Sequence, residues 1–467
     1  MTILHAQRAL LPVGWVDDIA IRIDSAGRIC HALPAVPGEA GNRAGPVLPG
    51  MPNVHSHAFQ RALAGRAERA GSGPDSFWTW RERMYELSQQ LTLADIETIA
   101  TLLYVEMLEA GYTAVCEFHY LHHGPGGLPH SDPAAASRAL VRAATATGIR
   151  LTLLPVLYMY SGFGQQPPLP SQAAFIHSVR DYLKLLDALC GEQSATLRVG
   201  VAFHSLRAVT AEAVQAVLAW RAKVAPDCPV HIHVAEQLRE VQECEAWSGR
   251  RPVDWLLERG WVDEHWCLVH ATHVTNDEIR RLAATGAVVG LCPTTEANLG
   301  DGLFPLGEFL AAGGRFGLGS DSHVSVSPVE ELRWLEYGQR LLHGRRNIAS
   351  SAGEPHSGAR LVRAALAGGS QALGQATGVI GTGHPADLLE LDASHPLLVG
   401  GDEGGNGDEL LDRFVFAGNR PLVTNVFVAG RQVVRDGHHA LAGAAVAAFA
   451  GVMQRICLPG PAGRTIR

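Results

Sequence analysis

Short apolar segments alternate with helical stretches through the middle of this 467-residue chain. Strands that alternate with helices in this way form parallel sheets. Eight such units over about 250 residues or more predict an α/β fold of the closed (β/α)8 type. An open doubly wound sheet is the alternative, but no G-x-G-x-x-G motif follows the first strand. The candidate strands are Pro52 to His57, Thr113 to His119, Arg150 to Leu157, Arg198 to His204, Pro229 to Ala235, Trp266 to Ala271, Ala287 to Cys292 and Arg315 to Ser320.

Both ends of the chain show a different, two-residue alternation. Ile19, Ile21 and Ile23 alternate with smaller or polar residues, and a turn at residues 25–27 leads into another short apolar segment. This pattern predicts a hairpin of half-buried strands. Similar segments return at residues 387–391 and 426–434, the second with a glycine-containing turn. We therefore expect the two ends to form one β module.

The overall composition excludes several classes of partner. The chain has 38 Lys and Arg against 46 Asp and Glu, a net charge of −8, and neither nucleic acid nor an anionic membrane attracts such a surface. The N-terminus lacks the basic start and apolar run of a signal peptide. The apolar stretch from Ala440 to Met453 is shorter than the roughly 20 residues that span a bilayer, so we predict a C-terminal helix there.

The eight cysteines contain no C-x-x-C pair, so the sequence indicates neither a disulfide framework nor a thiolate zinc site. A reducing compartment fits this usage. We expect a cytoplasmic protein that acts on a small molecule, without nucleic acid or membrane partners.

Two histidines stand at the end of the first predicted strand. His55 and His57 are separated by one residue, and alternate side chains of a strand point to the same face. In a barrel, the carboxyl ends of the strands converge on one mouth, where catalytic groups lie. These two imidazoles can therefore share one metal ion, although a hydrogen-bonded structural pair gives the same pattern.

Other strand ends add further polar groups to the same mouth. Strand five ends in His233, with Glu236 three residues later, where a carboxylate can move the protons of a metal-activated water without binding the metal. Strand six ends at His270. Strand eight leads to Asp321, which would be costly to bury unpaired and so predicts a metal or an imidazole as its partner. His231 lies deeper on strand five, and we expect it to be structural.

This set of residues, with P-G-M-P-N-V-H-S-H at residues 49–57 and G-S-D-S-H at 319–323, resembles the amidohydrolase superfamily. The H-x-x-E of strand five is similar to its deaminase branch. The resemblance covers roughly residues 1 to 440. It implies a TIM-type barrel at residues 49–382 and a small β-sandwich domain from residues 1–48 and 383–445, with a C-terminal helix and tail at 446–467.

The resemblance also implies a metal site. Members with two metals use a bridging lysine on strand four or a neighbouring glutamate, but strand four here has no lysine. We therefore expect one metal, held by His55, His57, His233 and Asp321. Three imidazoles and one carboxylate suit Zn2+, although iron fits the same ligand types. The expected catalytic residues are Glu236, His270 and Asp321.

Further segments are more specific and resemble the formimidoylglutamate deiminases of bacterial histidine degradation. They are H-S-H-A-F-Q-R-A-L-A-G at residues 55–65, F-W-T-W-R-E-R-M-Y at 77–85, C-E-F-H-Y at 116–120, F-H-S-L-R at 203–207 and H-V-A-E-Q at 233–237. The resemblance implies zinc-dependent conversion of N-formimino-L-glutamate to N-formyl-L-glutamate and ammonia. It implies substrate contacts from Gln60, Arg81, Tyr120, His204 and Arg207, one zinc per subunit and a homodimer.

The chemistry of this dicarboxylate agrees with the expected contacts, because guanidinium groups recognise carboxylates through paired charge-assisted hydrogen bonds.

Two alternatives remain open. Another aminohydrolase of the superfamily, acting on guanine, a related purine or a chlorinated triazine, would share the metal residues, so the distinction rests on Arg81, Tyr120, His204 and Arg207. A non-catalytic binding protein on the same barrel is less favoured, because the chain keeps every expected ligand.

Overall fold

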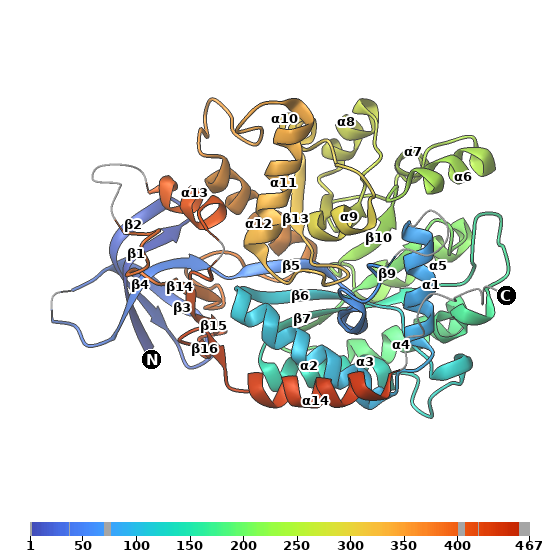
Figure 1. Cartoon of the computed structure of the whole chain (residues 1–467), viewed down its shortest axis with the longest axis horizontal. Coiled ribbons are helices and arrows are strands. Elements are labelled where there is room, and N and C mark those ends of the chain that lie inside the picture. The colour runs from blue at the N-terminus through green and yellow to red at the C-terminus, as the bar shows by residue number, and fades with distance from the viewer. Residues whose placement is uncertain (1, 37, 70–75, 400–406, 419, 457–467) are drawn as a thin grey trace, which may run out of the picture.

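The computed structural model describes residues 2–36, 38–69, 76–399, 407–418 and 420–456. Within these ranges, a closed parallel barrel lies beside a mixed sheet built from both chain ends (Figure 1). The predicted (β/α)8 barrel and the predicted β module are both confirmed. No described helix is long and apolar enough to cross a membrane.

The barrel strands follow one another in chain order around a closed ring, in which β6 pairs with both β5 and β7. All eight predicted strands are present, and the fourth is interrupted at Gly200. A Cβ atom at this glycine would lie 2.5 Å from Leu154 and 2.9 Å from Pro229, so a larger residue would collide with both neighbouring strands. The strands are β5 (Met51–Ser56), β6 (Tyr112–His119), β7 (Arg150–Leu157), β8 (Leu197–Val199), β9 (Val201–Ser205), β10 (Val230–Val234), β11 (Trp266–His270), β12 (Val288–Leu291) and β13 (Arg315–Leu318).

Helices cover the outside of the barrel (Figure 1). The longest, α2 (Leu93–Ala110), begins at the capping box of Thr92 and Asp95 and ends at Gly111, whose φ of 104° favours glycine, as the sequence predicts. The others are α3 (Ala135–Thr147), α4 (Val179–Cys190), α5 (Ala211–Val224), α6 (Leu238–Ser248), α7 (Pro252–Leu257), α8 (Asn276–Thr285), α9 (Pro293–Leu299), α10 (Leu306–Ala311), α11 (Pro328–His343) and α12 (Ser357–Leu373).

The mixed sheet joins four strands from each end of the chain at a seam between β4 and β14. The predicted hairpin is the antiparallel pair β2 and β3, and β1 and then β4 continue the sheet beyond β2 without an equally clear alternation in the sequence. A buried ion pair ties the sheet to the barrel, because Arg150 of β7 donates to both carboxylate oxygens of Asp387 at 2.9 and 3.1 Å. The strands are β1 (Thr2–Leu11), β2 (Gly14–Ile23), β3 (Ile29–Pro34), β4 (Asn42–Pro49), β14 (Leu388–Leu391), β15 (Val423–Val428), β16 (Arg431–Arg435) and β17 (His438–His439).

Three further helices lie outside the barrel repeat. Helix α1 (Phe77–Ser88) follows the 3-10 helix η1 (Ala58–Leu63). Helix α13 (Asp408–Phe416) precedes the last strands of the mixed sheet. The predicted C-terminal helix is α14 (Ala442–Arg455), which packs on α2 through Leu102, Val105 and Ala445 (Figure 1). Two other 3-10 helices, η2 (Pro125–Gly127) and η3 (Pro170–Phe175), lie in loops.

Candidate metal centre and active site

The carboxyl ends of the barrel strands bring five polar residues together, as expected from the sequence. His55 lies on β5 and His57 directly follows this strand, while His233 comes from β10, His270 from β11 and Asp321 from the turn after β13. All five are buried. Two overlapping groups of these side chains have ligand atoms close enough to hold a metal ion, namely His55 with His57 and His233, and His55 with His270 and Asp321.

The geometry of the three imidazoles fits a bound cation. The Nδ1–H groups of His57 and His233 donate to the carbonyl oxygens of Phe118 and His204, both at 2.9 Å, so their Nε2 atoms carry lone pairs. These two Nε2 atoms lie 3.0 and 2.9 Å from Nε2 of His55. One proton can serve only one of these contacts, whereas a metal ion can bind all three nitrogens. Asp321 Oδ1 adds a carboxylate 3.6 Å from His55 Nε2 and 3.4 Å from His57 Nε2.

Burial keeps the imidazoles in the neutral form that metals require. Burial lowers the pKa of His57 to about 3, with a smaller contribution from His270, and it lowers the pKa values of His55 and His233 well below their ordinary range. Burial also raises the pKa of Asp321 to about 7, and a nearby cation would oppose this shift.

Glu236 and His270 lie next to the three imidazoles and the carboxylate of Asp321. Nε2 of His270 is 3.7 Å from Glu236 Oε1 and also 3.7 Å from Asp321 Oδ2. Its Nδ1–H donates to Glu296 at 3.2 Å, which orients the ring. Burial lowers the pKa of His270, but the carboxylates of Glu236, Glu296 and Asp321 outweigh it and raise this pKa to about 10. Two carboxylates and one imidazole can therefore exchange protons at this point.

The backbone at these strand ends is held in an unusual conformation. His270 and Asp321 have φ angles of 68° and 46°, and Ala235, just before Glu236, has a φ of 51°. Left-handed conformations of residues other than glycine are costly and are frequent at functional sites. The turns after β10, β11 and β13 therefore aim these side chains at one point.

The predicted substrate residues line one cavity of about 40 Å3 with the metal residues His57, His233 and Asp321. Gln60 donates to the hydroxyl of Tyr120 at 2.7 Å, and the ring of His204 lies 4.3 Å from that of Tyr158. The Nε atoms of Arg81 and Arg207 are buried without a hydrogen-bond partner. Two guanidinium groups with unused donors therefore face the space next to the metal cluster.

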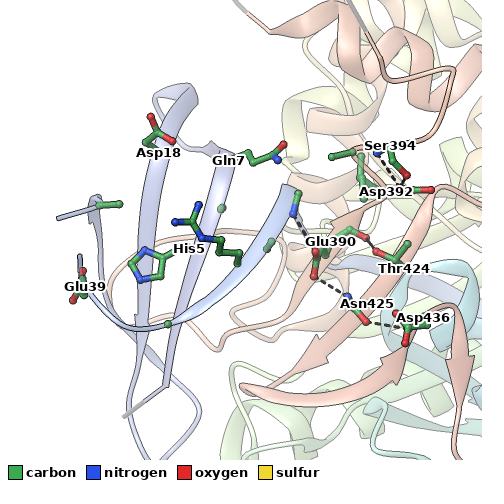
Figure 2. A pocket seen from close by; sticks show the side chains of 18 of the residues that line it. His5, Gln7, Asp18, Glu39, Glu390, Asp392, Ser394, Thr424, Asn425 and Asp436 are labelled. Carbon is green, nitrogen blue, oxygen red and sulfur yellow. Dashed lines mark hydrogen bonds between the residues drawn. The ribbon is translucent and has the colours of Figure 1, made fainter. Parts of the chain in front are cut away.

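A second, larger cavity of about 680 Å3 lies in the mixed sheet and has the opposite character (Figure 2). Its charged lining includes five carboxylates, of Asp18, Glu39, Glu390, Asp392 and Asp436, with Arg43 as a cation. Figure 2 shows several of these groups bonded within the sheet, such as Glu390 to Asn425 at 2.8 Å. This lining disfavours an anionic ligand, so the barrel mouth is the better candidate for a dicarboxylate.

The structure adds buried groups that the sequence did not single out. Glu296 bonds His270, and its signal is a glutamate in the first turn of α9, directly after strand β12. Tyr85 and Tyr158 line the cavity and both accept hydrogen bonds from Gln172. His231 is structural as expected, because its Nε2–H donates to the carbonyl of Ala372 at 2.9 Å.

Comparisons with known proteins cover both the barrel and the mixed sheet. The family model described as amidohydrolase family matches residues 47–433, and the model of the N-terminal domain of formimidoylglutamate deiminase HutF matches residues 1–45. A formimidoylglutamate deiminase of Pseudomonas aeruginosa is 54% identical over 94% of this chain and 96% of that protein. A crystal structure of an amidohydrolase from Brucella melitensis has a TM-score of 0.91 at 44% identity, covering 98% of this chain and 100% of that one.

A more distant structure shares the fold. An adenosine deaminase from Xanthomonas campestris, solved with bound zinc, has a TM-score of 0.81 at 22% identity and covers 97% of this chain and 98% of that one. The family models together match almost the whole described chain, and the similarity to the Pseudomonas protein extends across both the barrel and the mixed sheet. The chain therefore belongs to the amidohydrolase family, in the group of the formimidoylglutamate deiminases.

Proposed function

We propose that this protein hydrolyses the formimino group of N-formimino-L-glutamate to give N-formyl-L-glutamate and ammonia. The observation that carries the proposal is the pair of guanidinium groups of Arg81 and Arg207 beside the metal cluster, whose Nε atoms are buried without a hydrogen-bond partner. A dicarboxylate can satisfy their unused donors through charge-assisted hydrogen bonds. The name of the 54% identical Pseudomonas protein supports the same substrate.

We further propose that His55, His57, His233 and Asp321 hold one zinc ion per subunit. The donor set of three neutral imidazoles and one carboxylate suits zinc, and the two groups of ligand atoms share His55, which favours a single ion. Zinc bound there would polarise a water molecule and lower its pKa toward neutrality.

The protein's own residues then handle the protons. Glu236 accepts a proton as the water oxygen bonds to the formimino carbon, and it passes this proton to the imino nitrogen, which becomes an amino group. When the bond from carbon to this nitrogen breaks, the hydroxyl oxygen gives its remaining proton through Glu236 to the nitrogen, which leaves as ammonia while the formyl C=O bond forms. His270, whose ring is oriented by its bond to Glu296, donates a hydrogen bond to the attacking oxygen. Asp321, which lies 3.7 Å from His270, can share in the first proton transfer.

The remaining cavity residues orient the substrate. Arg81 and Arg207 bind its carboxylates, and Gln60, Tyr120 and His204 close the space between them and the metal cluster. Glu236 and Glu240 hold the pKa of Arg207 above its ordinary value although burial acts to lower it, so this residue stays cationic. A substrate with two negative charges therefore enters a site with two fixed positive charges.

Ammonia release by the zinc-replete protein tests the proposal. We expect rapid release from N-formimino-L-glutamate and none from guanine, a chlorinated triazine or N-formyl-L-glutamate. Release of ammonia from guanine alone, or of chloride from the triazine alone, would refute the assignment of substrate and leave the metal hydrolase intact.

Three further features are part of the proposal. We propose a homodimer, supported by Trp334, Tyr337 and Leu341, which α11 exposes on one face. A cytoplasmic location is supported by the seven described cysteines, whose thiols are free. The domain division at residues 1–48, 49–382, 383–445 and 446–467 is supported by the separate barrel and mixed sheet. Size-exclusion chromatography with light scattering tests the dimer.

A further inference from the structure

Three arginine side chains surround the ring of Trp78 at the mouth of the barrel. The guanidinium carbons of Arg239, Arg81 and Arg207 lie 4.4, 4.5 and 5.5 Å from the ring centroid. All three distances are within the range of cation–π attraction. The arginines come from three places, the first turn of α6, helix α1 itself and the turn after β9, so Trp78 joins three otherwise separate elements.

The three arginines differ in whether a carboxylate pairs with them. Arg239 is largely exposed and pairs with Glu243 at 2.7 Å. Among the described residues, no carboxylate lies within salt-bridge distance of Arg81 or Arg207, although both line the same cavity. Two cations close together repel each other, and Glu240 and Glu236 offset only the part of this repulsion that falls on Arg207, whose pKa they raise. The negative face of an indole ring offsets part of this repulsion without occupying the donors that the substrate needs.

Trp78 itself does not line the cavity, whereas Arg81 and Tyr85, three and seven residues later on α1, do. The spacing places these three residues on one face of the helix. Arg81 lies over both rings, 4.5 Å from Trp78 and 5.5 Å from Tyr85. Trp78 can therefore act on the substrate only through the guanidinium groups that it contacts.

We propose that Trp78 is a positioning residue that holds Arg81 and Arg207 in place for the two substrate carboxylates, with Arg239 stacked against the ring from outside. This inference rests on the proposed function for the identity of the substrate. The stacking itself concerns the recognition of any dicarboxylate of similar length.

Steady-state kinetics of Trp78→Leu and Trp78→Phe test the proposal. Leucine removes the ring and phenylalanine keeps an aromatic face. We expect KM for N-formimino-L-glutamate to rise about tenfold in Trp78→Leu, with kcat changed by less than about threefold, because the lost contact acts equally on ground and transition states. Trp78→Phe should recover most of the loss. Trp220→Leu, which removes a half-buried tryptophan from α5 outside the cavity, serves as the matched control and should leave both constants unchanged.

A double-mutant cycle with Arg81→Met separates positioning from a general packing role. If Trp78 acts through Arg81, the rise in KM caused by Trp78→Leu should shrink to less than about half in the Arg81→Met background. Equal effects in both backgrounds would overturn the proposal. A fall in kcat at unchanged KM, or a KM that phenylalanine does not recover at normal zinc content and thermal midpoint, would overturn it as well.

Calorimetric binding of glutarate distinguishes this inference from the proposed reaction. Glutarate carries two carboxylates and no formimino group, so its affinity reports the arginines without any turnover. Weaker binding of glutarate to Trp78→Leu than to the unchanged protein supports the role of Trp78 even if N-formimino-L-glutamate is not hydrolysed. Equal binding to both refutes that role even if the reaction is confirmed.

Discussion

Replacing Glu236 with glutamine isolates the proton-transfer role that we assign to this carboxylate. Glu236 is buried at the barrel mouth with Oε1 3.7 Å from His270 Nε2, and it belongs to none of the described groups of ligand atoms that could hold a metal. Glutamine has nearly the same size but neither accepts nor releases a proton near neutral pH. The variant should therefore keep its fold and its zinc while losing the group that moves protons.

The expected fall in kcat follows from the number of proton transfers that Glu236 carries out. General acid–base catalysis contributes about 10²- to 10⁴-fold, and Glu236 serves both the attack of water and the departure of ammonia. We therefore expect kcat to fall by about 10⁴-fold, or about 5 kcal/mol of barrier. Asp321 and His270 remain in place and can supply a slow residual path.

Ammonia release measures this loss, and zinc content and thermal unfolding serve as the companion readouts. Glu264→Gln is the matched control, because Glu264 is exposed and lies just before β11, at the opposite end of that strand from His270. A Glu236→Gln enzyme with kcat within tenfold of the unchanged protein would refute the role of this carboxylate. So would a variant that loses its zinc, because Glu236 would then be acting on the metal.

Three other outcomes follow from the structure. Asp387→Asn should lower the free energy of unfolding by about 3 kcal/mol, because it leaves the buried guanidinium of Arg150 without its counter-ion, and an unchanged midpoint in urea would contradict this. Removal of the metal with a chelator should lower the thermal midpoint and abolish ammonia release, and added zinc should restore both; a midpoint indifferent to the chelator would argue against a structural contribution. Burial lowers the pKa of His177 to about 4. Between pH 6.5 and pH 4 this histidine therefore binds a proton in the unfolded chain but not in the folded protein. As the pH falls through this range, the group lowers the free energy of unfolding by up to about 1.4 kcal/mol per pH unit. His177→Gln should make the decline in the unfolding midpoint over this range shallower, and identical slopes would show that the residue does not titrate as inferred.

The barrel could be predicted because its strands are short apolar runs that end in polar residues. His55, His57, His233, His270 and Asp321 stand at such ends, so topology alone places them together. Gly200 is a local sign of an irregularity in the fourth strand, but the reason for a glycine there, the collision of a Cβ atom with Leu154 and Pro229, is visible only in three dimensions.

Contacts between segments that are distant in the sequence could not be predicted from local sequence patterns. Glu296 bonds His270 across two neighbouring strand ends, and Gln172 reaches Tyr85 and Tyr158 from a 3-10 helix. The stacking of Arg207 and Arg239 on Trp78 depends on the packing of α1 against the barrel. These residues belong to no motif or periodic pattern in the sequence. Only the folded structure shows which residues each of them contacts.

The seam between β4 and β14 sets an order of events during protein synthesis. Pro49 pairs with Leu388, and about 340 residues separate the two strands along the chain. At roughly 5–20 residues per second, the ribosome needs about 20–70 s to deliver the partner of β4. During this interval the edge of β4 is open to wrong pairing, and Pro46 and Pro49 reduce the risk because neither has an amide hydrogen to donate. All the barrel strands are therefore synthesised before β1 to β4 can pair with β14 to β17 and complete the mixed sheet.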